Sequence, residues 1–185
     1  KTGGFVKPAH LTVGQWLQEW LTSYVETNCA PRTAASYEGL VRLHIAPELG
    51  GLLLSELEAR HIQAFFARKK AEGKVSVRTV RYCGSLLRQS LGHAVKMGLI
   101  GRNVCEATDP PRPERKTMSS LAPADVGTFL EAARQTPYGA FFACLLHTGL
   151  RRGEALGLKW KAVDLDMATL SVVETGYKLN GEYLF

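Results

Sequence analysis

The chain has 185 residues, of which 45% are hydrophobic and 22% are charged, with a net charge of +6. This composition is typical of a globular protein with an apolar core, and it excludes a disordered chain. No run approaches the roughly 18 apolar residues that a membrane span requires, so we expect no contact with a membrane. We also expect no signal peptide, because the start KTGG leads into a polar stretch.

Four cysteines, none of them in a CxxC pair, argue against a zinc site and against a disulfide framework. They favour reduced thiols in the cytoplasm, and we expect neither a metal nor another cofactor. The missing initiator Met and the end at GEYLF favour a piece of a longer protein.

The net positive charge is confined to the first part of the chain. Residues 1–108 contain 14 Lys and Arg against 8 Asp and Glu, whereas residues 109–185 contain 9 of each. Residues 73–105 contain no acidic residue at all. This asymmetry indicates an anionic partner for the first part, with nucleic acid as the leading candidate.

Two helices are predicted near the start of the chain. Thr12 and Gln15 have capping-box form, and apolar residues then recur at helical spacing as far as Tyr24. Pro31 suits the first turn of the second helix, which we expect to end at Pro47.

A third helix is predicted from Ser55 and Glu58, another capping box, as far as Gly73. The fourth helix should cover residues 76 to about 97, with its apolar residues on one side. Basic and polar residues at spacings of three and four share the opposite side, where no carboxylate is available for local pairing. We expect this basic side to face phosphates.

Residues 109–118, DPPRPERKTM, contain three prolines and a cluster of charges, so we expect a linker between two domains there. A helix should start at Pro123. The apolar run of residues 138–146 predicts a central buried helix that ends at Gly149. A short helix should follow over residues 152–157.

The last part of the chain is predicted to contain strands. Residues 169–173 form the first, and Asn180 with Gly181 predicts a hairpin turn into a second. No glycine-rich phosphate loop, HExxH or GxSxG motif occurs in the sequence. Their absence argues against a P-loop nucleotide-binding protein, a zinc protease and a serine hydrolase.

The motif HTGLRRGE, residues 147–154, places two arginines where the apolar helix ends. Arginine is almost never fully buried without a partner, so Arg151 or Arg152 should hold an anion in a partly desolvated place. Two interpretations stay open. The anion is Glu154 in an internal ion pair, or it is a phosphate that the arginine clamps while Glu154 orients the guanidinium from behind.

The stretch TGLRRGEALGLKWKAVDLD, residues 148–166, resembles the first arginine box of the tyrosine recombinases, the phage-integrase family. APRTAASYEGLVRLHIAPELGGLLLSELEARHIQAFF and VSVRTVRYCGSLLRQSLGHAVKMGLIGRN resemble the core-binding domain of the same family. The resemblance covers essentially the whole chain. It implies a mainly α protein with a four-helix SAM-like core-binding domain in residues 1–108 and a proline-rich linker in residues 109–118. Residues 119–185 would be the truncated start of an α+β catalytic domain.

The resemblance also implies a function, namely site-specific recombination and integration at double-stranded DNA attachment sites through a covalent phosphotyrosine link. The family uses no metal or other cofactor for this reaction, and it implies self-assembly to a tetramer on DNA in the prokaryotic cytoplasm, at the nucleoid. Arg151 matches the family's catalytic arginine, and Glu154 matches the supporting acidic position. Arg152 matches a variable position.

Other catalytic groups of the family, its HxxR box and nucleophilic tyrosine, would lie beyond Phe185. We therefore expect this piece to bind DNA without cleaving it. Lys178 should be a surface residue, and Tyr177 and Tyr183 should be ordinary strand aromatics. His147 should be a buried histidine at a helix end.

DNA contacts are expected on the second and fourth helices, from helix phase and from the family's use of these helices. Most should reach backbone phosphates, with few contacts to bases. The candidates are Arg32, Thr33, Ser36, Ser76, Arg78, Arg81, Tyr82, Ser85 and Arg88. Lys69, Lys70 and Lys74 could equally contact DNA or only add solubility.

Two other functions stay open. A non-catalytic helical DNA-binding regulator would explain the uneven charge but not the arginine after the apolar helix. A helical protein-interaction domain would explain the basic side by an acidic protein partner. Salt-dependent binding to random duplex DNA separates the last function from the other two, and a downstream HxxR box with a tyrosine separates recombinase from regulator.

Overall fold

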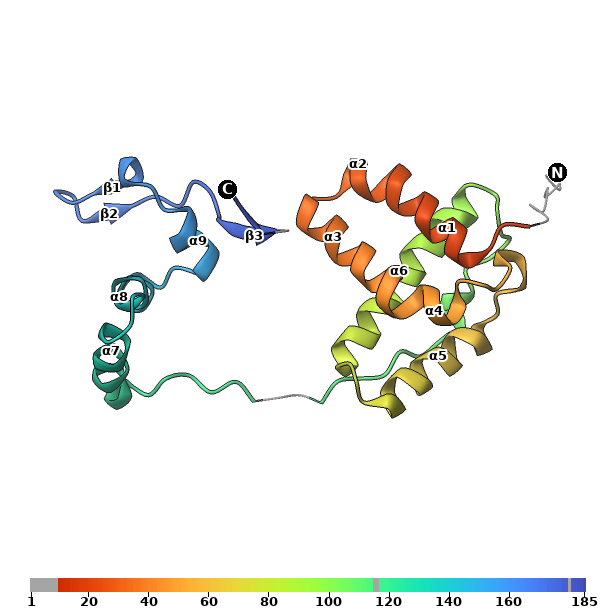
Figure 1. The fold of residues 1–185 in the computed structure, drawn as a ribbon, viewed down its shortest axis with the longest axis horizontal. Coiled ribbons are helices and arrows are strands. Elements are labelled where there is room, and N and C mark those ends of the chain that lie inside the picture. Colours follow the sequence, from red (N-terminus) through yellow and green to blue (C-terminus); the bar gives the residue numbers. More distant parts are fainter. Residues whose placement is uncertain (1–9, 115–116, 180) are drawn as a thin grey trace. The chain divides into compact units, whose positions relative to one another are not determined.

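The computed structural model describes residues 10–114, 117–179 and 181–185. The chain divides into two units, Lys1–Arg115 and Lys116–Phe185, each of which is described by itself (Figure 1). The described residues are mainly helical, as the sequence predicts, and unit 2 contains short strands beside its helices. No helix in the described part of the chain is long and apolar enough to cross a membrane.

The first helical segment begins at the predicted capping box. The Thr12 hydroxyl accepts the backbone N–H of Gln15 at 3.2 Å, and the Gln15 side chain accepts the backbone N–H of Thr12 at 2.9 Å. Helix α1 (Val13–Trp20) runs through a π-helical turn, η1 (Leu21–Val25), into α2 (Glu26–Asn28). The predicted start is therefore confirmed.

The second helical segment begins as predicted but ends later. Helix α3 (Pro31–Leu40) passes through a second π-helical turn, η2 (Val41–Ile45), into α4 (Ala46–Leu49). The prediction that Pro47 ends the helix is wrong. The π turn places Pro47 in the first turn of α4. Backbone N–H groups in a first helical turn make no α-helical hydrogen bond, so the missing N–H of proline costs nothing there.

The third helix, α5 (Ala59–Glu72), begins one residue after Glu58, and the predicted capping role of Ser55 is wrong. Ser55 lies in a separate 3₁₀ turn, η3 (Leu54–Glu56). Glu58 is instead the N-cap residue of α5, and its backbone N–H donates to Nδ1 of His61 at 3.2 Å. Gly73 ends the helix with a φ of 64°, as predicted.

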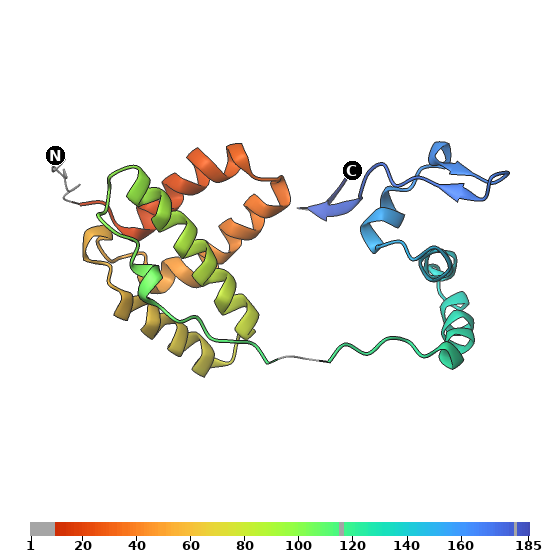
Figure 2. The same cartoon turned by 180° about the vertical axis from the view of Figure 1, so that it is seen from behind.

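The fourth helix, α6 (Val77–Lys96), has Ser76 as its N-cap and is followed by the 3₁₀ turn η4 (Val104–Ala107). Figure 2 shows α6, in yellow-green, crossing unit 1. One side of α6 is buried against α3, α5 and η4. Contact with α5 is close at Gly84, where an added Cβ atom would lie 2.9 Å from the Phe66 ring.

The core of unit 1 is large and dominated by aromatic and aliphatic side chains. Trp16, Trp20, Phe65 and Phe66 are all at most 2% exposed. Burial of such side chains is the main favourable contribution to folding, since each removes a large apolar area from water. The predicted apolar sides of the four helices therefore meet in one core.

Unit 2 contains three helices and two short hairpins in its described residues. Its elements are the 3₁₀ turn η5 (Pro123–Asp125), α7 (Val126–Arg134), α8 (Gly139–Thr148), α9 (Arg152–Gly157), the 3₁₀ turn η6 (Trp160–Ala162), β1 (Val163–Asp164), β2 (Thr169–Leu170), β3 (Tyr177–Leu179) and β4 (Glu182–Leu184). β1 pairs antiparallel with β2, and β3 pairs antiparallel with β4.

The strand prediction for residues 169–173 is only partly correct. Strand structure covers Thr169–Leu170 alone, and it pairs with β1, which the sequence did not predict. The predicted hairpin is formed by β3 and β4, and Gly181, which lies between these strands, has a φ of 91°. Asn180, the other predicted turn residue, lies outside the described residues.

Helix α8 is at the predicted position, but the prediction that it is buried is wrong. Gly139 is its only buried residue, Leu146 is 38% exposed, and His147 is exposed where a buried histidine was expected. In the described part of unit 2, α8 contacts mainly α7 and α9, so much of its apolar surface has no covering element.

Candidate functional site

The turn between α8 and α9 is built by three residues of the motif. Gly149 adopts a φ of 70° and donates its N–H to the carbonyl of Leu145 at 2.9 Å, which ends α8. The Thr148 hydroxyl accepts the N–H of Leu150 at 3.3 Å. Arg151 follows at once as the residue before α9, so the turn presents its side chain at the start of a new helix.

Arg151 and Glu154 form a two-point contact across the first turn of α9. The Glu154 Oε1 atom accepts from Arg151 Nη1 at 2.8 Å, and Oε2 accepts the backbone N–H of Arg151 at 2.8 Å. This backbone N–H, and then the guanidinium, hold the pKa of Glu154 below its ordinary value. The carboxylate therefore fixes one edge of the guanidinium and remains charged.

The expectation of a partly desolvated arginine is wrong for the described residues. The Arg151 side chain is 86% exposed although it is paired, whereas the Glu154 side chain is only 17% exposed. Arg152 is exposed as well. The guanidinium can be paired and exposed at the same time, because it has five N–H donors and Glu154 accepts only from the Nη1 atom. The remaining donors are accessible to an external anion.

The predicted basic side of α6 faces outward. Arg78, Arg81, Ser85 and Arg88 are all exposed, and Tyr82 is 56% exposed. Ser76 is the N-cap of the helix, and its hydroxyl accepts the N–H of Thr79 at 3.1 Å. The side chains nominated on α6 therefore lie on one accessible surface, which we call the basic face of α6.

Arg88 differs from the other arginines of this face because it also supports the fold. Its Nη2 atom donates to the carbonyl of Cys105 at 3.0 Å, and its own carbonyl accepts from Asn103 at 2.8 Å. These contacts attach η4 to α6. The side chain thus combines an exposed position with an internal partner that the sequence did not predict.

The candidates on α3 lie at its first turns. Arg32 and Ser36 are exposed, and Thr33 is half-buried. The Tyr37 hydroxyl donates to Gln89 Oε1 at 3.3 Å, and this hydrogen bond joins α3 to α6. The two helices that carry the predicted DNA contacts are therefore fixed to each other within unit 1.

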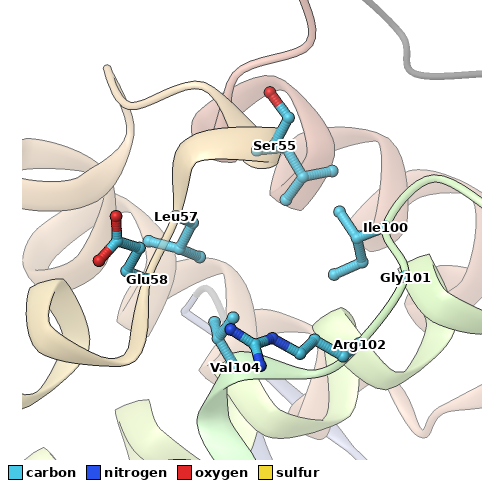
Figure 3. A pocket seen from close by; sticks show the side chains of 8 residues that line it. Ser55, Leu57, Glu58, Ile100, Gly101, Arg102 and Val104 are labelled. Carbon is cyan, nitrogen blue, oxygen red and sulfur yellow. The ribbon is translucent and has the colours of Figure 1, made fainter.

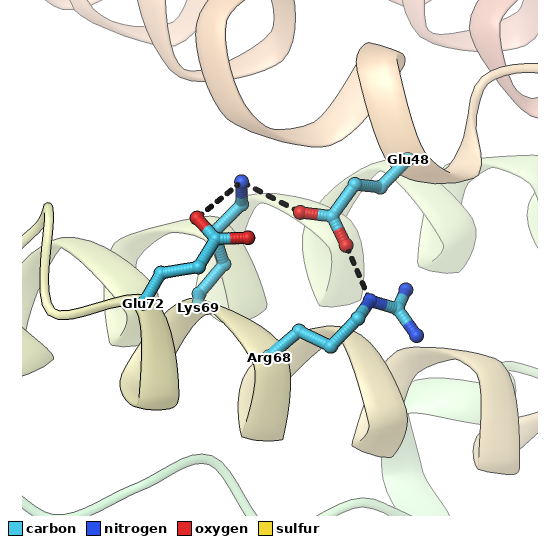
Figure 4. A network of polar contacts seen from close by, with 4 residues as sticks. All are labelled: Glu48, Arg68, Lys69 and Glu72. Carbon is cyan, nitrogen blue, oxygen red and sulfur yellow. Dashed lines mark hydrogen bonds and ion pairs between the residues drawn. The ribbon is translucent and has the colours of Figure 1, made fainter.

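Lys69 belongs to an ion-pair network that joins α4 to α5 (Figure 4). Its Nζ atom lies 2.6 Å from Glu48 Oε1 and 3.6 Å from Glu72 Oε2, and its side chain is 12% exposed. Glu48 also accepts from Arg68 at 2.8 Å. Lys69 is therefore paired within the fold, and whether it also contacts DNA stays a prediction.

The charges of this network stabilise one another. Burial opposes the ionisation of Glu48, but hydrogen bonds from Lys69 and Arg68 outweigh it and lower the pKa of that carboxyl. The hydrogen bond that Lys69 donates to Glu48 raises the pKa of Lys69 in turn. No local pattern could reveal the pairing, because Glu48 precedes Arg68 by 20 residues.

A cavity of about 430 Å³ opens on unit 1 between the start of α5 and the segment that leads from α6 to η4 (Figure 3). Leu57, Ile100 and Val104 supply apolar surface, and Glu58 and Arg102 lie at its sides. None of the residues nominated from the sequence lines this cavity. The cavity is therefore separate from the residues nominated as DNA contacts.

The cysteines form no disulfide among the described residues. Burial raises the pKa of the Cys83 thiol to about 11 and that of Cys105 to about 12. Thiols with such pKa values remain protonated and unreactive at neutral pH. The described residues also contain no group of three or more side chains that could hold a metal ion.

Comparisons with known proteins agree on one family. Residues 12–70 match the family profile described as the phage integrase N-terminal SAM-like domain. The chain is 30% identical over 169 residues to a protein named tyrosine recombinase XerC-like from Caldanaerobacter subterraneus subsp. tengcongensis, and covers 43% of its length. It is 28% identical over 165 residues to an integrase from Saccharopolyspora erythraea, and covers 38% of that protein. Each alignment spans 88% of this chain.

Solved structures give the same result. The chain is 36% identical to the phage integrase SAM-like domain from Moorella thermoacetica, with a TM-score of 0.50, and the match covers 61% of this chain and 96% of that domain. The Tn1549 transposon integrase in complex with circular intermediate DNA has the same fold at 21% identity, with a TM-score of 0.80. That match covers 94% of this chain and 58% of the transposon integrase. The chain therefore belongs to the phage integrase, or tyrosine recombinase, family.

Proposed function

We propose that this chain is part of a site-specific DNA recombinase, and that it binds duplex DNA and supplies the first catalytic arginine. The observation that carries the proposal is the exposed guanidinium of Arg151, which Glu154 holds by one edge within the TGLRRGE motif. The relatives' names support the same reaction class, since they are tyrosine recombinases and integrases. The chain spans less than half of these relatives' length, so the reaction is proposed for the full-length protein.

The two units have different tasks in this proposal. Residues 1–108 form the core-binding domain, residues 109–118 form the linker, and residues 119–185 form the first part of the catalytic domain. The uneven charge supports this division, because the net positive charge lies in the first unit and the arginine site in the second.

The proposed DNA contacts are on α3 and α6. Arginines on the basic face of α6 donate to phosphate oxygens, and because a guanidinium offers parallel N–H groups, it binds two such oxygens at once. Ser36, Tyr82 and Ser85 add hydroxyl donors, which suit phosphates and sugar edges. The full proposed set is Arg32, Thr33, Ser36, Ser76, Arg78, Arg81, Tyr82, Ser85 and Arg88.

Arg151 acts on the scissile phosphodiester. Attack by a hydroxyl on phosphorus concentrates negative charge on the two non-bridging oxygens, and a preoriented guanidinium stabilises that charge. In the reaction class proposed, a tyrosine hydroxyl forms the new bond to phosphorus and the DNA 5′-hydroxyl leaves with a proton. The phosphodiester bond energy is then kept in the phosphotyrosine link.

Neither Tyr177 nor Tyr183 serves as that nucleophile in our proposal. Both belong to the hairpin of β3 and β4, where Tyr183 is 60% exposed and the ring lies 5.5 Å from Lys178 Nζ. The 185-residue chain alone therefore binds DNA without cleaving it. In the full-length protein we propose a tetramer assembled on double-stranded attachment sites in the prokaryotic cytoplasm, at the nucleoid.

Two measurements test the proposal. The 185-residue chain should bind random duplex DNA with an affinity that falls steeply as salt rises, because binding releases counterions from phosphates. The full-length protein should form a covalent complex with attachment-site DNA that survives denaturation. Salt-independent binding, or no covalent complex, would contradict it.

A further inference from the structure

Helix α9 carries the arginine site, but its own sequence holds it only weakly. It spans 6 residues, Arg152–Gly157, and two of them, Gly153 and Gly157, are glycines. Isolated helices of fewer than about 12 residues are marginal in water, and glycine lowers helix stability further. Contacts with other segments must therefore fix the direction in which Arg151 points.

Residues 174–176 lie directly on the glycine side of α9. The backbone N–H of Gly176 donates to the carbonyl of Gly153 at 2.8 Å. A Cβ atom added to Gly157 would lie 2.5 Å from the carbonyl oxygen of Glu174. One added to Gly153 would lie 3.2 Å from the carbonyl oxygen of Gly176. Both positions leave room for a backbone and not for a side chain.

An ion pair fastens the same segment just beyond the end of α9. Lys159 Nζ pairs with the Glu174 carboxylate, and the Glu174 side chain is only 28% exposed. Lys159 Nζ also lies 5.8 Å from the centre of the Phe185 ring. Residues 174–176 are therefore attached to α9 near its first turn, at Gly153, and again after its last residue. We call this arrangement the α9 clamp.

We propose that Gly153 and Gly157 are positioning residues for Arg151, because they allow the α9 clamp to close and to hold the guanidinium in the direction that meets a phosphodiester. This inference rests on the proposed function, since it concerns the cleavage that Arg151 serves. Neither glycine has a side chain that could contact DNA. Their effect on cleavage therefore passes through Arg151, and the substitutions should be coupled.

The test is a double-mutant cycle in the full-length protein. Gly157→Ala should slow single-turnover cleavage of duplex DNA about 10–100-fold, because it displaces the clamp and with it the guanidinium. The dissociation constant for the same DNA should change by less than about threefold, since the basic face of α6 is untouched. Gly153→Ala should also slow cleavage, but less, because its added Cβ atom would lie farther from the backbone of residues 174–176. This variant tests the proposal if Gly157→Ala folds poorly.

Two further readouts distinguish positioning from a general loss of structure. When Gly157→Ala is added to a protein that already carries Arg151→Lys, cleavage should slow by a further factor of less than about three. With a neutral methylphosphonate at the scissile position, the advantage of the charged phosphate should shrink in Gly157→Ala as it does in Arg151→Lys, because both lose the two-pronged contact of a guanidinium with the charged oxygens. Gly127→Ala is the matched control, since a Cβ atom at Gly127 has nothing within 4 Å and the residue lies in α7.

Each outcome bears on one proposal. Unimpaired cleavage by Gly157→Ala and Gly153→Ala, while Arg151→Lys cleaves at least about 100-fold more slowly than wild type, would overturn the positioning role and leave the proposed function intact. Two other results would also overturn the positioning role. In the first, Gly157→Ala slows cleavage equally in the wild-type and Arg151→Lys proteins. In the second, Gly157→Ala prefers the charged phosphate over the methylphosphonate as strongly as the wild-type protein does. Unimpaired cleavage by Arg151→Lys would overturn the proposed function itself.

Discussion

The indole N–H of Trp20 donates to Nδ1 of His93 at 3.1 Å, and this hydrogen bond joins α1 to the last turns of α6. Tyr24 contacts the same imidazole ring edge to face, with ring centres 4.1 Å apart. The imidazole accepts at Nδ1, so His93 must be neutral at that nitrogen. Burial, and then the charge of Lys96, lower the pKa of His93.

The lowered pKa of His93 predicts that unit 1 loses stability in acid. The unfolded chain binds this proton at its ordinary pKa near 6.5, whereas the folded protein resists it, so the free energy of unfolding falls as the pH drops below about 6.5. Urea unfolding followed by tryptophan fluorescence between pH 8 and pH 5 measures the effect. His93→Asn should flatten the dependence in this range. An equally steep dependence in that variant would contradict the assignment to His93.

Close packing of α6 on α5 predicts that Gly84→Ala destabilises unit 1. The added methyl group would meet the buried Phe66 ring at 2.9 Å, and overpacking of this kind costs roughly 1–3 kcal/mol of the free energy of unfolding. Gly39→Ala on α3 is the control, because an added Cβ atom there has nothing within 4 Å and alanine favours a helix by roughly 0.5–1 kcal/mol. Equal stability of the two variants would disprove the close contact.

The network around Glu48 predicts that Lys69→Met lowers stability and leaves DNA binding unchanged. Loss of the cation leaves a poorly solvated carboxylate, for which we expect a loss of about 1–3 kcal/mol. Lys70→Met, at the exposed neighbouring position, should have almost no effect on stability. Thermal unfolding and a DNA-binding titration of both variants check this. Weaker DNA binding by Lys69→Met at temperatures where it is fully folded would show that the residue does reach DNA.

The basic face of α6 predicts the salt dependence of DNA binding. Arg78→Ala combined with Arg81→Ala should weaken binding by roughly 1–3 kcal/mol or more and should lower the slope of log K against log salt by about 1 for each lost phosphate contact. Arg42→Ala combined with Arg60→Ala removes the same charge from exposed positions on η2 and α5 that are not among the proposed DNA contacts. If the two pairs of substitutions changed the slope equally, net charge and not the face of α6 would account for binding.

Local sequence patterns predicted the helices of unit 1 well. The capping box of Thr12 and Gln15 and the glycine stop at Gly73 are present, and the fourth helix starts within one residue of the predicted position, because each of these features depends on neighbours within four residues. Pro47 misled the prediction because a π-helical turn, which no local pattern signals, precedes it. The placement of the basic side of α6 followed from helical period alone.

Tertiary partners were beyond the reach of the sequence. Nothing in the residues near Lys69 indicates Glu48, and nothing near Arg88 indicates the carbonyl of Cys105. The arginine motif predicted the contact of Arg151 with Glu154, because the two are one helical turn apart. The exposure of the Arg151 side chain was not predicted, because it depends on how the surrounding segments cover the turn between α8 and α9.

The central claim concerns one guanidinium, that of Arg151, and cleavage by the Arg151→Lys protein tests it most directly. In the full-length protein, single-turnover formation of the covalent DNA complex should fall by at least about 100-fold, because lysine keeps the charge and loses the two-pronged contact. The dissociation constant for attachment-site DNA should stay within about threefold of the wild-type value, because phosphate contacts elsewhere supply the affinity. Covalent complex formed at the wild-type rate would contradict the account.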